Sequence, residues 1–301
     1  MGEIWGSWTR PHRTGWVVGL LGGLVAVLAV GCTDREPDSL FDAAGYHVRG
    51  DTVFHLKAFP GSAVTVEGAD AATFEALDRT YGRDSTRVYY DGNALPEADP
   101  GSFVLLDRSG FARDDKNVHQ ADRLLSDDPD HFEFLAGDMA KDRAAVYWSD
   151  GSILSRDPKG FAIVSDGDHY LFTKGSADVH VNGVKIADAN PSSFRLLSGA
   201  YSRDDRSIFY FTDRVAEAAP ANFEVIDGPY ATDDRRVYWM GRVIDGADPL
   251  SFRVLNVDFE CAGDTRRAYY RQTPIDDTDP ATFPDGLAVS GCSATSISFA
   301  P

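Results

Sequence analysis

The sequence predicts an all-β protein, a tandem repeat of eight β-hairpin units of about 29 residues, and two observations lead to this prediction. The first is a recurring Pro-x-x-Phe block, and the second is a short run of β-branched and aromatic residues in every copy. No helix-length apolar periodicity follows Gly31. The phenylalanines of the block are 29 to 33 residues apart: Phe74 (a copy without the proline), Phe103, Phe132, Phe161, Phe194, Phe223, Phe252 and Phe283. Such a period indicates one supersecondary unit that must stack on its neighbours to bury its apolar face.

Residues 81–106 show the expected structure of one unit. The run Val88–Tyr90 has high β propensity and predicts a strand. Asp91-Gly92 directly after it predicts a hairpin turn, because glycine accepts positive φ without strain. Asp99-Pro100 then predicts a single helical or 3₁₀ turn, since proline at the first position has no N–H to satisfy. We expect Phe103 to close this turn onto the core before the chain becomes extended again.

Three aromatic positions recur in the units. Adjacent positions of a strand point to opposite faces, so we expect one of the two neighbouring aromatic ladders to be buried and the other at least partly exposed. The ladder expected inside contains Tyr89, His119, Tyr147, His180, Phe209, Tyr238 and Tyr269. The ladder expected to be partly exposed contains Tyr90, Trp148, Tyr210, Trp239 and Tyr270. The third position lies upstream and holds Tyr46, Tyr81, Phe111, Met139, Phe172, Tyr201, Tyr230 and Cys261.

We expect the units to form a β-solenoid or superhelix of short hairpins, and a closed eight-bladed β-propeller is the alternative. In favour of the ring, the first unit lacks a preceding strand, which residues 287–289 could supply. Against it, a unit of about 29 residues is short for a four-stranded blade, since typical blades have about 40 residues or more.

Residues 1–31 resemble the signal peptide of a bacterial lipoprotein. Arg10 and Arg13 precede an uncharged stretch that is too short and glycine-rich for a comfortable transmembrane span. The stretch ends Leu28-Ala29-Val30-Gly31-Cys32, which is similar to a lipobox with alanine where leucine is usual. The resemblance implies lipidation of Cys32 and a lipid-anchored location in the cell envelope, facing the periplasm or the cell exterior. An uncleaved anchor or an ordinary signal peptide is the alternative. Residues 32–45 then predict a polar tether.

Cys261 and Cys292 are the two cysteines left once Cys32 is lipidated. An even pair in an exported chain is normally a disulfide, and a loop of roughly 30 residues would stabilise by about 3 kcal/mol in the chain-entropy model. Because Cys261 takes the position of Tyr201 and Tyr230, the bond would tie a C-terminal capping strand, within residues 286–301, across the open end of the array. Two free thiols are the alternative.

The layout Tyr-x-x-Asp…Val-Tyr-Tyr-x-Gly…Ala-Asp-Pro-x-Ser-Phe resembles the DKNYY repeat family of bacterial proteins. Letters of that signature appear at Asp115-Lys116-Asn117-Val118-His119 and at 84–90, and the resemblance extends over residues 46–285 as eight repeats. Departures are Gly175, where the repeat has aspartate, and insertions near 59–67 and 167–170. The resemblance implies the repeat organisation and no particular activity.

One aspartate recurs in most units and could be a Ca²⁺ ligand or an Asx-turn residue: Asp84, Asp114, Asp142, Asp204, Asp233 and Asp264. The alternating carboxylates of a calcium loop are absent, which favours the turn. His119 and His180 occupy an aromatic position, where we expect them to pack in place of tyrosine. No spacing is typical of a zinc site, a nucleophile elbow or a phosphate loop, so the sequence predicts no catalytic residue, no metal and no cofactor. With 47 acidic against 29 basic residues, the net charge of −18 excludes nucleic acid as a partner.

These features predict a non-catalytic cell-envelope lipoprotein that acts as a binding or scaffold module through its repeat surface. The expected partners are the membrane, through the N-terminal lipid, and an envelope protein, peptide or glycan. A row of Tyr and Trp flanked by Asp and Asn is typical of surfaces that stack sugars or grip peptides, although such rings could instead cover the edge of the neighbouring unit. The alternative functions are an envelope carbohydrate hydrolase with an Asp pair and a purely structural spacer.

Overall fold

The computed structural model describes residues 43–59, 61–167 and 169–301. Residues 44–301 form one compact unit. The predicted signal peptide (1–31), the lipidation site Cys32 and most of the tether (32–45) lie outside the described residues. In the part of the chain that the structure describes, no helix has the length and apolar character needed to cross a bilayer.

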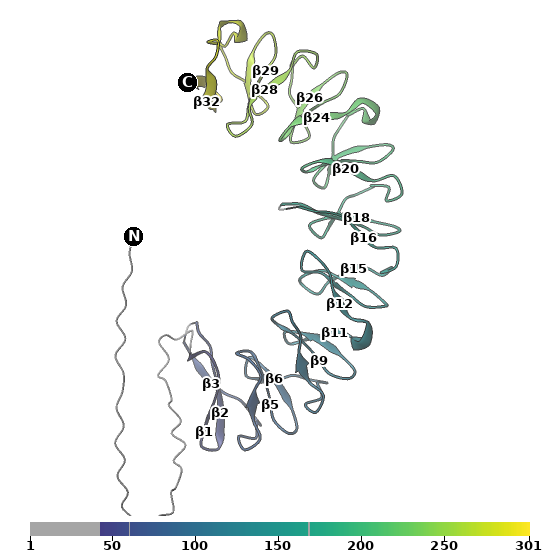
Figure 1. Cartoon of the computed structure of the whole chain (residues 1–301), viewed down its shortest axis with the longest axis vertical. Coiled ribbons are helices and arrows are strands. Elements are labelled where there is room, and N and C mark those ends of the chain that lie inside the picture. The colour runs from purple at the N-terminus through teal and green to yellow at the C-terminus, as the bar shows by residue number, and fades with distance from the viewer. Residues whose placement is uncertain (1–42, 60, 168) are drawn as a thin grey trace, which may run out of the picture. The chain divides into compact units, whose positions relative to one another are not determined.

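The described chain forms eight small antiparallel sheets in chain order, followed by a hairpin (Figure 1). Each sheet is a meander of neighbouring strands, and we number the sheets as units 1 to 8. Unit 1 has three strands, β1 (Gly45–Arg49), β2 (Thr52–Leu56) and β3 (Ala63–Thr65). Unit 2 has four strands, β4 (Glu75–Ala76), β5 (Tyr81–Arg83), β6 (Val88–Tyr90) and β7 (Asn93–Ala94). Unit 3 contains β8 (Val104–Leu105), β9 (Phe111–Arg113), β10 (Val118–Gln120) and β11 (Arg123–Ser126). Unit 4 contains β12 (Glu133–Phe134), β13 (Ala140–Lys141), β14 (Val146–Tyr147) and β15 (Ile153–Ser155).

Units 5 to 8 repeat the same order. Their strands are β16 (Ala162–Asp166), β17 (Leu171–Lys174), β18 (Val179–Val181) and β19 (Val184–Lys185); β20 (Arg195–Ser198), β21 (Tyr201–Arg203), β22 (Ile208–Tyr210) and β23 (Asp213–Arg214); β24 (Glu224–Asp227), β25 (Tyr230–Thr232), β26 (Val237–Trp239) and β27 (Arg242–Val243); β28 (Arg253–Asn256), β29 (Cys261–Gly263), β30 (Ala268–Tyr270) and β31 (Thr273–Pro274). The predicted all-β tandem repeat is therefore confirmed.

The Pro-x-x-Phe blocks form the tight turns that connect successive sheets. Three of them are 3₁₀ turns with proline in the first turn, η1 (Pro129–His131), η2 (Pro220–Asn222) and η3 (Pro280–Thr282). At η3, the Asp279 carboxylate accepts the Ala281 N–H, which is the capping role expected of an acidic residue before the proline. The phenylalanine that follows is buried at Phe103, Phe194 and Phe223 and half-buried in the other copies.

Apolar residues lie in layers between successive sheets. Tyr81, Val88 and Leu95 of unit 2 form one buried cluster with Phe103 and Ala112, which belong to the turn before unit 3 and to its second strand. Equivalent clusters join units 6 and 7 and units 7 and 8. A sheet inside the array therefore has a neighbour on both faces, and strands of two to five residues are stable because both faces are packed.

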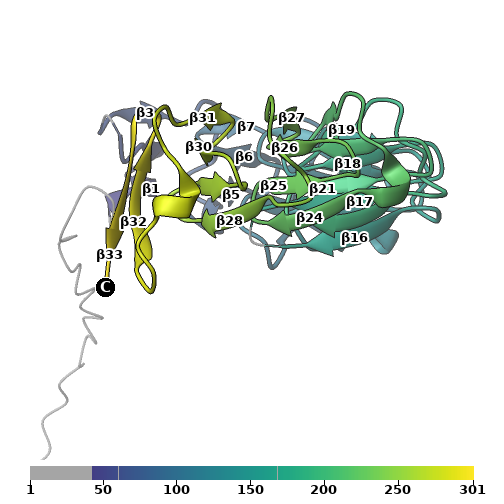
Figure 2. The same ribbon diagram turned by 90° about the horizontal axis from the view of Figure 1, so that it is seen from above.

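The chain does not close into a propeller. Val289, which could have completed the sheet of unit 1, lies in β32 (Ala288–Ser293) and pairs with Phe299 of β33 (Ser296–Ala300). β1 is bonded only to β2 in its three-stranded sheet. The C-terminal segment is thus a two-stranded hairpin rather than the single capping strand that we expected, as β32 and β33 show in Figure 2.

Tyrosines at the upstream aromatic position fasten one unit to the next. The Tyr81 hydroxyl of unit 2 lies 3.0 Å from the carbonyl oxygens of Gly110 and Ala121 in unit 3. The Tyr201 hydroxyl donates to Pro229 O at 2.9 Å and accepts the Gly241 N–H at 2.9 Å. We call these residues staple tyrosines: Tyr46, Tyr81, Tyr201 and Tyr230.

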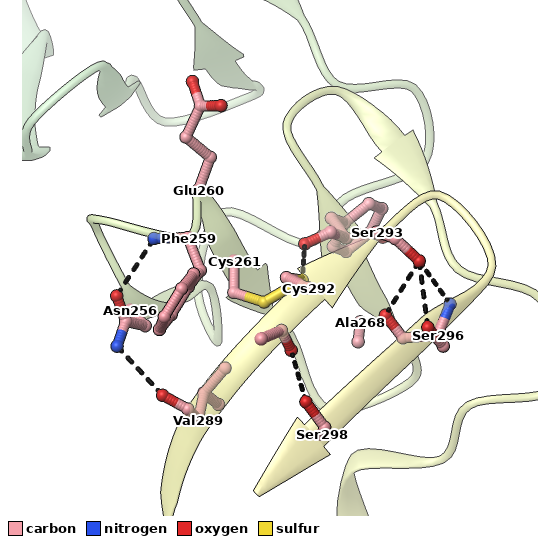
Figure 3. Close-up of a disulfide and its surroundings, with 12 residues drawn as sticks. Asn256, Phe259, Glu260, Cys261, Ala268, Val289, Cys292, Ser293, Ser296 and Ser298 are labelled. Carbon is pink, nitrogen blue, oxygen red and sulfur yellow. Dashed lines mark hydrogen bonds between the residues drawn. A yellow bond between two sulfur atoms is a disulfide. The ribbon is translucent and has the colours of Figure 1, made fainter.

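Cys261 holds the staple position of unit 8 and is disulfide-bonded to Cys292 of β32, with a Cα–Cα distance of 5.9 Å (Figure 3). Cys261 is fully buried. The Asn256 side-chain amide donates to Val289 O at 3.0 Å and adds a second link to the hairpin. A covalent bond therefore replaces the tyrosine hydrogen bond at the C-terminal end of the array.

Truncating a buried phenylalanine should cost far more stability than removing an exposed aspartate. Phe223→Ala should lower the free energy of unfolding by about 3–5 kcal/mol. The reason is that Phe223 is 5% exposed and its ring centroid lies 5.5 Å from that of Tyr201 and 5.4 Å from that of Tyr238. Asp205→Ala should cost less than about 1 kcal/mol, because its carboxylate accepts hydrogen bonds from Asn190 and Ser193 at the surface. Denaturant unfolding measures both, and equal losses would contradict the assignment of the buried position.

Reducing the disulfide should lower the melting temperature, because the hairpin then keeps only noncovalent links to unit 8. The double variant Cys261→Ala/Cys292→Ala should melt lower than the oxidised protein and should not respond to reductant. Mass spectrometry of unreduced peptides should find Cys261 and Cys292 linked. Two alkylatable thiols in protein isolated from its natural compartment would show that the bond does not form there.

Candidate functional site

The five aromatic residues predicted to contact a ligand lie in units 2, 4, 6, 7 and 8, one in each unit. Four of them end the third strand, and Trp148 directly follows it. All five are half-buried: Tyr90, Trp148, Tyr210, Trp239 and Tyr270. In unit 2, the neighbouring edge-strand residue is Asn93, and in unit 7 it is Arg242. The five rings are thus partly exposed, as expected, and at Tyr90 and Trp239 a polar residue lies opposite on the edge strand.

The other side of these rings packs on tyrosines and on the following unit. Tyr90 meets Tyr81 edge-on with ring centroids 5.0 Å apart. A Cβ atom added at Gly183 of unit 5 would come within 2.6 Å of the Trp148 ring, and one at Gly241 of unit 7 within 2.8 Å of Tyr210 Cβ. Glycine in these hairpin turns is thus required by close approach as well as by positive φ. The packing agrees with the alternative interpretation, in which the rings cover the edge of the next unit.

The aromatic positions of units 7 and 8 share one cation. The Arg271 guanidinium lies 5.6 Å from the Trp239 ring centroid and 5.0 Å from that of Tyr270. Its Nε donates to the Glu260 carboxylate at 2.5 Å, and this hydrogen bond raises the pKa of Arg271. Trp239, Tyr270, Arg271 and Glu260 form what we call the unit 7–8 patch. It is the part of the ladder where flat rings and both charge signs lie together, the combination that binds sugars and peptides.

The recurring aspartates are buried, each 1–4% exposed, and one carboxylate oxygen closes the turn before the third strand. At Asp84, Oδ1 accepts the backbone N–H groups of Thr86 and Arg87 at 2.7 and 2.8 Å. The same two bonds occur at Asp114, Asp142, Asp204, Asp233 and Asp264. The Asx-turn prediction is confirmed.

The second carboxylate oxygen of the recurring aspartate accepts hydrogen bonds from outside the turn, which we did not predict from the sequence. Asp84 Oδ2 accepts the N–H of Asp70, in the turn that enters unit 2, at 3.0 Å, and the Tyr89 hydroxyl at 2.7 Å. Asp233 likewise accepts the Ala219 N–H at 3.0 Å and the Tyr238 hydroxyl at 2.9 Å. We call this four-donor arrangement the aspartate clip. It ties the entering turn, the Asx turn and the third strand of one unit together.

These hydrogen bonds, together with burial, shift the pKa values of the aspartates and tyrosines that they join. Burial alone would raise the pKa of Asp84, but the hydrogen bonds from Asp70, Tyr89 and Thr86 outweigh it and hold that pKa well below its usual range. The same balance lowers the pKa of Asp233. Burial and the hydrogen bond to Asp84 raise the pKa of Tyr89 to about 12. Asp84 and Asp233 are therefore ionised carboxylates bonded to the neutral phenols of Tyr89 and Tyr238 at neutral pH.

His119 takes the phenol's place in unit 3, where its Nε2 lies 3.5 Å from Asp114 Oδ2 with both side chains buried. Burial lowers the pKa of His119. His119 therefore packs as a substitute for tyrosine, as predicted.

Comparison with known proteins places this repeat in a family. The model of the DKNYY family matches residues 39–123, 111–273 and 230–285. The chain belongs to the DKNYY family. No curated protein and no solved structure matches it. In this DKNYY protein, the aspartate clip and the staple tyrosine are the structural roles of the repeated polar letters.

Unit 5 is the four-stranded unit that lacks the clip aspartate. Gly175 stands at that position, and the turn is otherwise retained, since Gly175 N–H donates to Asp178 O at 2.8 Å. His180 occupies the aromatic position at 9% exposure, and its Nδ1 is buried without a hydrogen-bond partner. A cavity of about 210 Å³ lies here, lined by Ser155, Gly175, Ala177 and His180 among others.

The remaining candidate chemistry does not converge on one site. Among the described residues, no group of three or more His, Cys, Asp or Glu side chains could hold a metal ion. The repeated aspartates lie one per unit, and their oxygens are occupied by the donors of the clip. The signal that could have revealed the clip is the fixed spacing of aspartate five residues before tyrosine, at Asp84 and Tyr89 and again at Asp233 and Tyr238.

Removing one clip should destabilise the array, and its matched control is the adjacent exposed aspartate. Asp233→Asn should lower the free energy of unfolding by about 2–4 kcal/mol, because an amide cannot accept all four buried donors, whereas Asp234→Asn should cost less than about 1 kcal/mol. The folded-state pKa of Asp233 lies below its unfolded value, so its contribution is present above about pH 4 and is lost as the pH falls through the folded pKa. Denaturant unfolding between about pH 3 and 7 should show a weaker acid loss in Asp233→Asn than in the wild type. An unchanged pH profile would contradict the clip.

Proposed function

We propose that this protein is a non-catalytic binding or scaffold lipoprotein of the cell envelope, lipid-anchored through Cys32 and facing the periplasm or cell exterior. The observation that carries the proposal is that the repeated polar side chains hold the array together. Each clip aspartate is buried and accepts at least three hydrogen bonds, and each staple tyrosine bonds to the next unit, so these groups serve assembly. Such a stack offers a long repetitive surface, the geometry with which repeat proteins bind extended partners.

Two further features support the location. The leader ending in Gly31-Cys32 is similar to a lipoprotein signal peptide. The Cys261–Cys292 bond suits an oxidising compartment outside the cytoplasm.

The surface we favour for contact is the unit 7–8 patch, where Trp239 and Tyr270 flank Arg271. Aromatic faces stack on the apolar faces of sugar rings or on peptide side chains, and the Arg271–Glu260 pair supplies a donor and an acceptor. The partner is therefore expected to be an envelope glycan, peptide or protein. A carbohydrate hydrolase would need two free carboxylates about 5–10 Å apart in one cleft, which the occupied clip aspartates do not favour.

One experiment tests anchor and binding together. For the anchor, the full chain is expressed in a bacterial host, labelled with a lipid precursor and fractionated. For binding, the same protein is crosslinked to envelope extract and, separately, applied to a glycan array. Cys32→Ser should lose the label and leave the membrane fraction. Trp239→Ala should lose at least about tenfold in binding, because one stacking ring is removed, and Met240→Ala, an exposed neighbour, should bind normally. The absence of label in the wild type would overturn the anchor. The absence of any specific glycan or envelope signal would overturn the binding function and favour a structural spacer.

A further inference from the structure

Unit 5 retains the donors of an aspartate clip while lacking the carboxylate. In the other four-stranded units, Oδ1 of the clip aspartate accepts the N–H groups two and three residues further on. In unit 5 these groups belong to Ala177 and Asp178, and within the described residues no acceptor replaces the missing oxygen. Because the backbone turn at Gly175 is the same, both N–H groups point toward the place of the absent side chain.

Two side chains complete the donor set. At the end of unit 3, the Ser126 hydroxyl accepts the Asp128 N–H at 3.0 Å and donates to Oδ2 of the unit 4 clip residue Asp142 at 2.5 Å. At the end of unit 4, Ser155 accepts the Asp157 N–H at 3.1 Å in the same way, but unit 5 offers its hydroxyl proton no clip carboxylate. A Cβ atom at Gly175 would lie 3.4 Å from Ser155 Oγ, which locates the hydroxyl at the vacant position.

His180 faces the same vacancy. The equivalent His119 presents Nε2 to the Asp114 carboxylate at 3.5 Å, whereas Gly175 offers His180 no carboxylate. His180 is more than nine-tenths buried and lines the cavity, and its Nδ1 has no partner. Because His119 Nδ1 also lacks a partner although Asp114 is present, the group of His180 that corresponds to the carboxylate contact of unit 3 is Nε2. The vacancy thus lacks the acceptor that the other units supply to the two turn N–H groups.

The surrounding charges permit an anion. Arg156 lines the cavity together with two acidic residues, Asp157 and Asp178. The Asp157 carboxylate accepts the Gly160 N–H at 3.0 Å, and the Asp178 carboxylate pairs with Lys185. Clip aspartates in other units ionise beside similar acidic neighbours, as Asp114 does next to Asp99. The cavity of about 210 Å³ has room for a carboxylate with a short substituent.

We propose that unit 5 carries a carboxylate-binding site, in which a ligand carboxylate takes the place of the aspartate side chain absent at Gly175. The two backbone N–H groups would hold one oxygen, and Ser155 with His180 would hold the other. The ligand is a small organic acid or the carboxylate of a polypeptide, since both present the same group. This site does not depend on the lipid anchor or on binding at the unit 7–8 patch.

Thermal unfolding of the full chain in detergent, with acetate, N-acetylglycine or chloride at equal ionic strength, tests the site. Acetate at about 100 mM should raise the melting temperature of the wild type by about 2–4 °C relative to chloride. Gly175→Asp should melt higher without ligand and should not respond to acetate, because its own carboxylate fills the vacancy. The added Cβ meets Ser155 Oγ at an ordinary contact distance, and Gly175 does not need positive φ.

Two further variants keep the test decisive. Asp204→Gly creates the same vacancy in unit 6 and should lower the melting temperature with partial recovery in acetate. Ser155→Ala should weaken the acetate response of the wild type at least about threefold in apparent Kd, since one hydrogen bond is lost. A tenfold tighter response to N-acetylglycine than to acetate would identify a polypeptide C-terminus as the source, and equal responses would identify a small acid. An acetate response that is absent in the wild type, or equal in the wild type and Gly175→Asp, would overturn the proposal.

Discussion

The buried clip aspartate organises six of the eight units, all except units 1 and 5. A sheet of two- to five-residue strands has too few backbone hydrogen bonds and too little apolar area to be stable alone. A single carboxylate gathers donors from the entering turn, the Asx turn and the third strand, as at Asp84 with Asp70, Thr86 and Tyr89. Burying a charge is costly unless its hydrogen-bonding capacity is filled, and here it is filled within one unit. The clip thus sets the local geometry that repeats along the chain.

Stacking depends on a second set of contacts that cross from unit to unit. Each staple tyrosine contributes its ring to the layer between two sheets and its hydroxyl to the backbone of the next unit, as Tyr201 does at Pro229 and Gly241. The hairpin glycines allow the following unit to approach rings such as Trp148 closely. A ring face that the next unit covers is not available to stack on a ligand. This leaves the unit 7–8 patch, with Arg271 over two rings, as the favoured contact surface.

The repeat period, the strand at Val88–Tyr90, its Asp91-Gly92 turn and the Asx role of Asp84 could all be predicted from the sequence, because each is a local preference. The burial of both faces of a sheet, seen in the fully buried neighbours Val88 and Tyr89, could not be predicted in the same way. Period-2 alternation tells which residues share a face, but it does not tell that a neighbouring sheet covers each face. The hydrogen bond that joins the second carboxylate oxygen of Asp84 to another turn could not be predicted either, because its donor, the Asp70 N–H, is 14 residues away. The closing hairpin at β32 and β33 likewise depends on tertiary pairing that no repeat copy displays.

Two departures from the repeat at the staple position are compensated by another link, whereas the departure at Gly175 is not. Where Phe111 lacks the staple hydroxyl, Arg108 donates to Met139 O and Leu135 O of unit 4 at 3.0 and 3.1 Å. Where Cys261 replaces the tyrosine, a disulfide makes the link. At Gly175, the donors around the vacancy are retained and no described group satisfies them. The turn keeps its backbone N–H groups at Ala177 and Asp178, and the cavity of about 210 Å³ beside them is lined by several residues and filled by none. This difference between Gly175 and the compensated positions supports the proposal that unit 5 lost a structural carboxylate and gained a binding site.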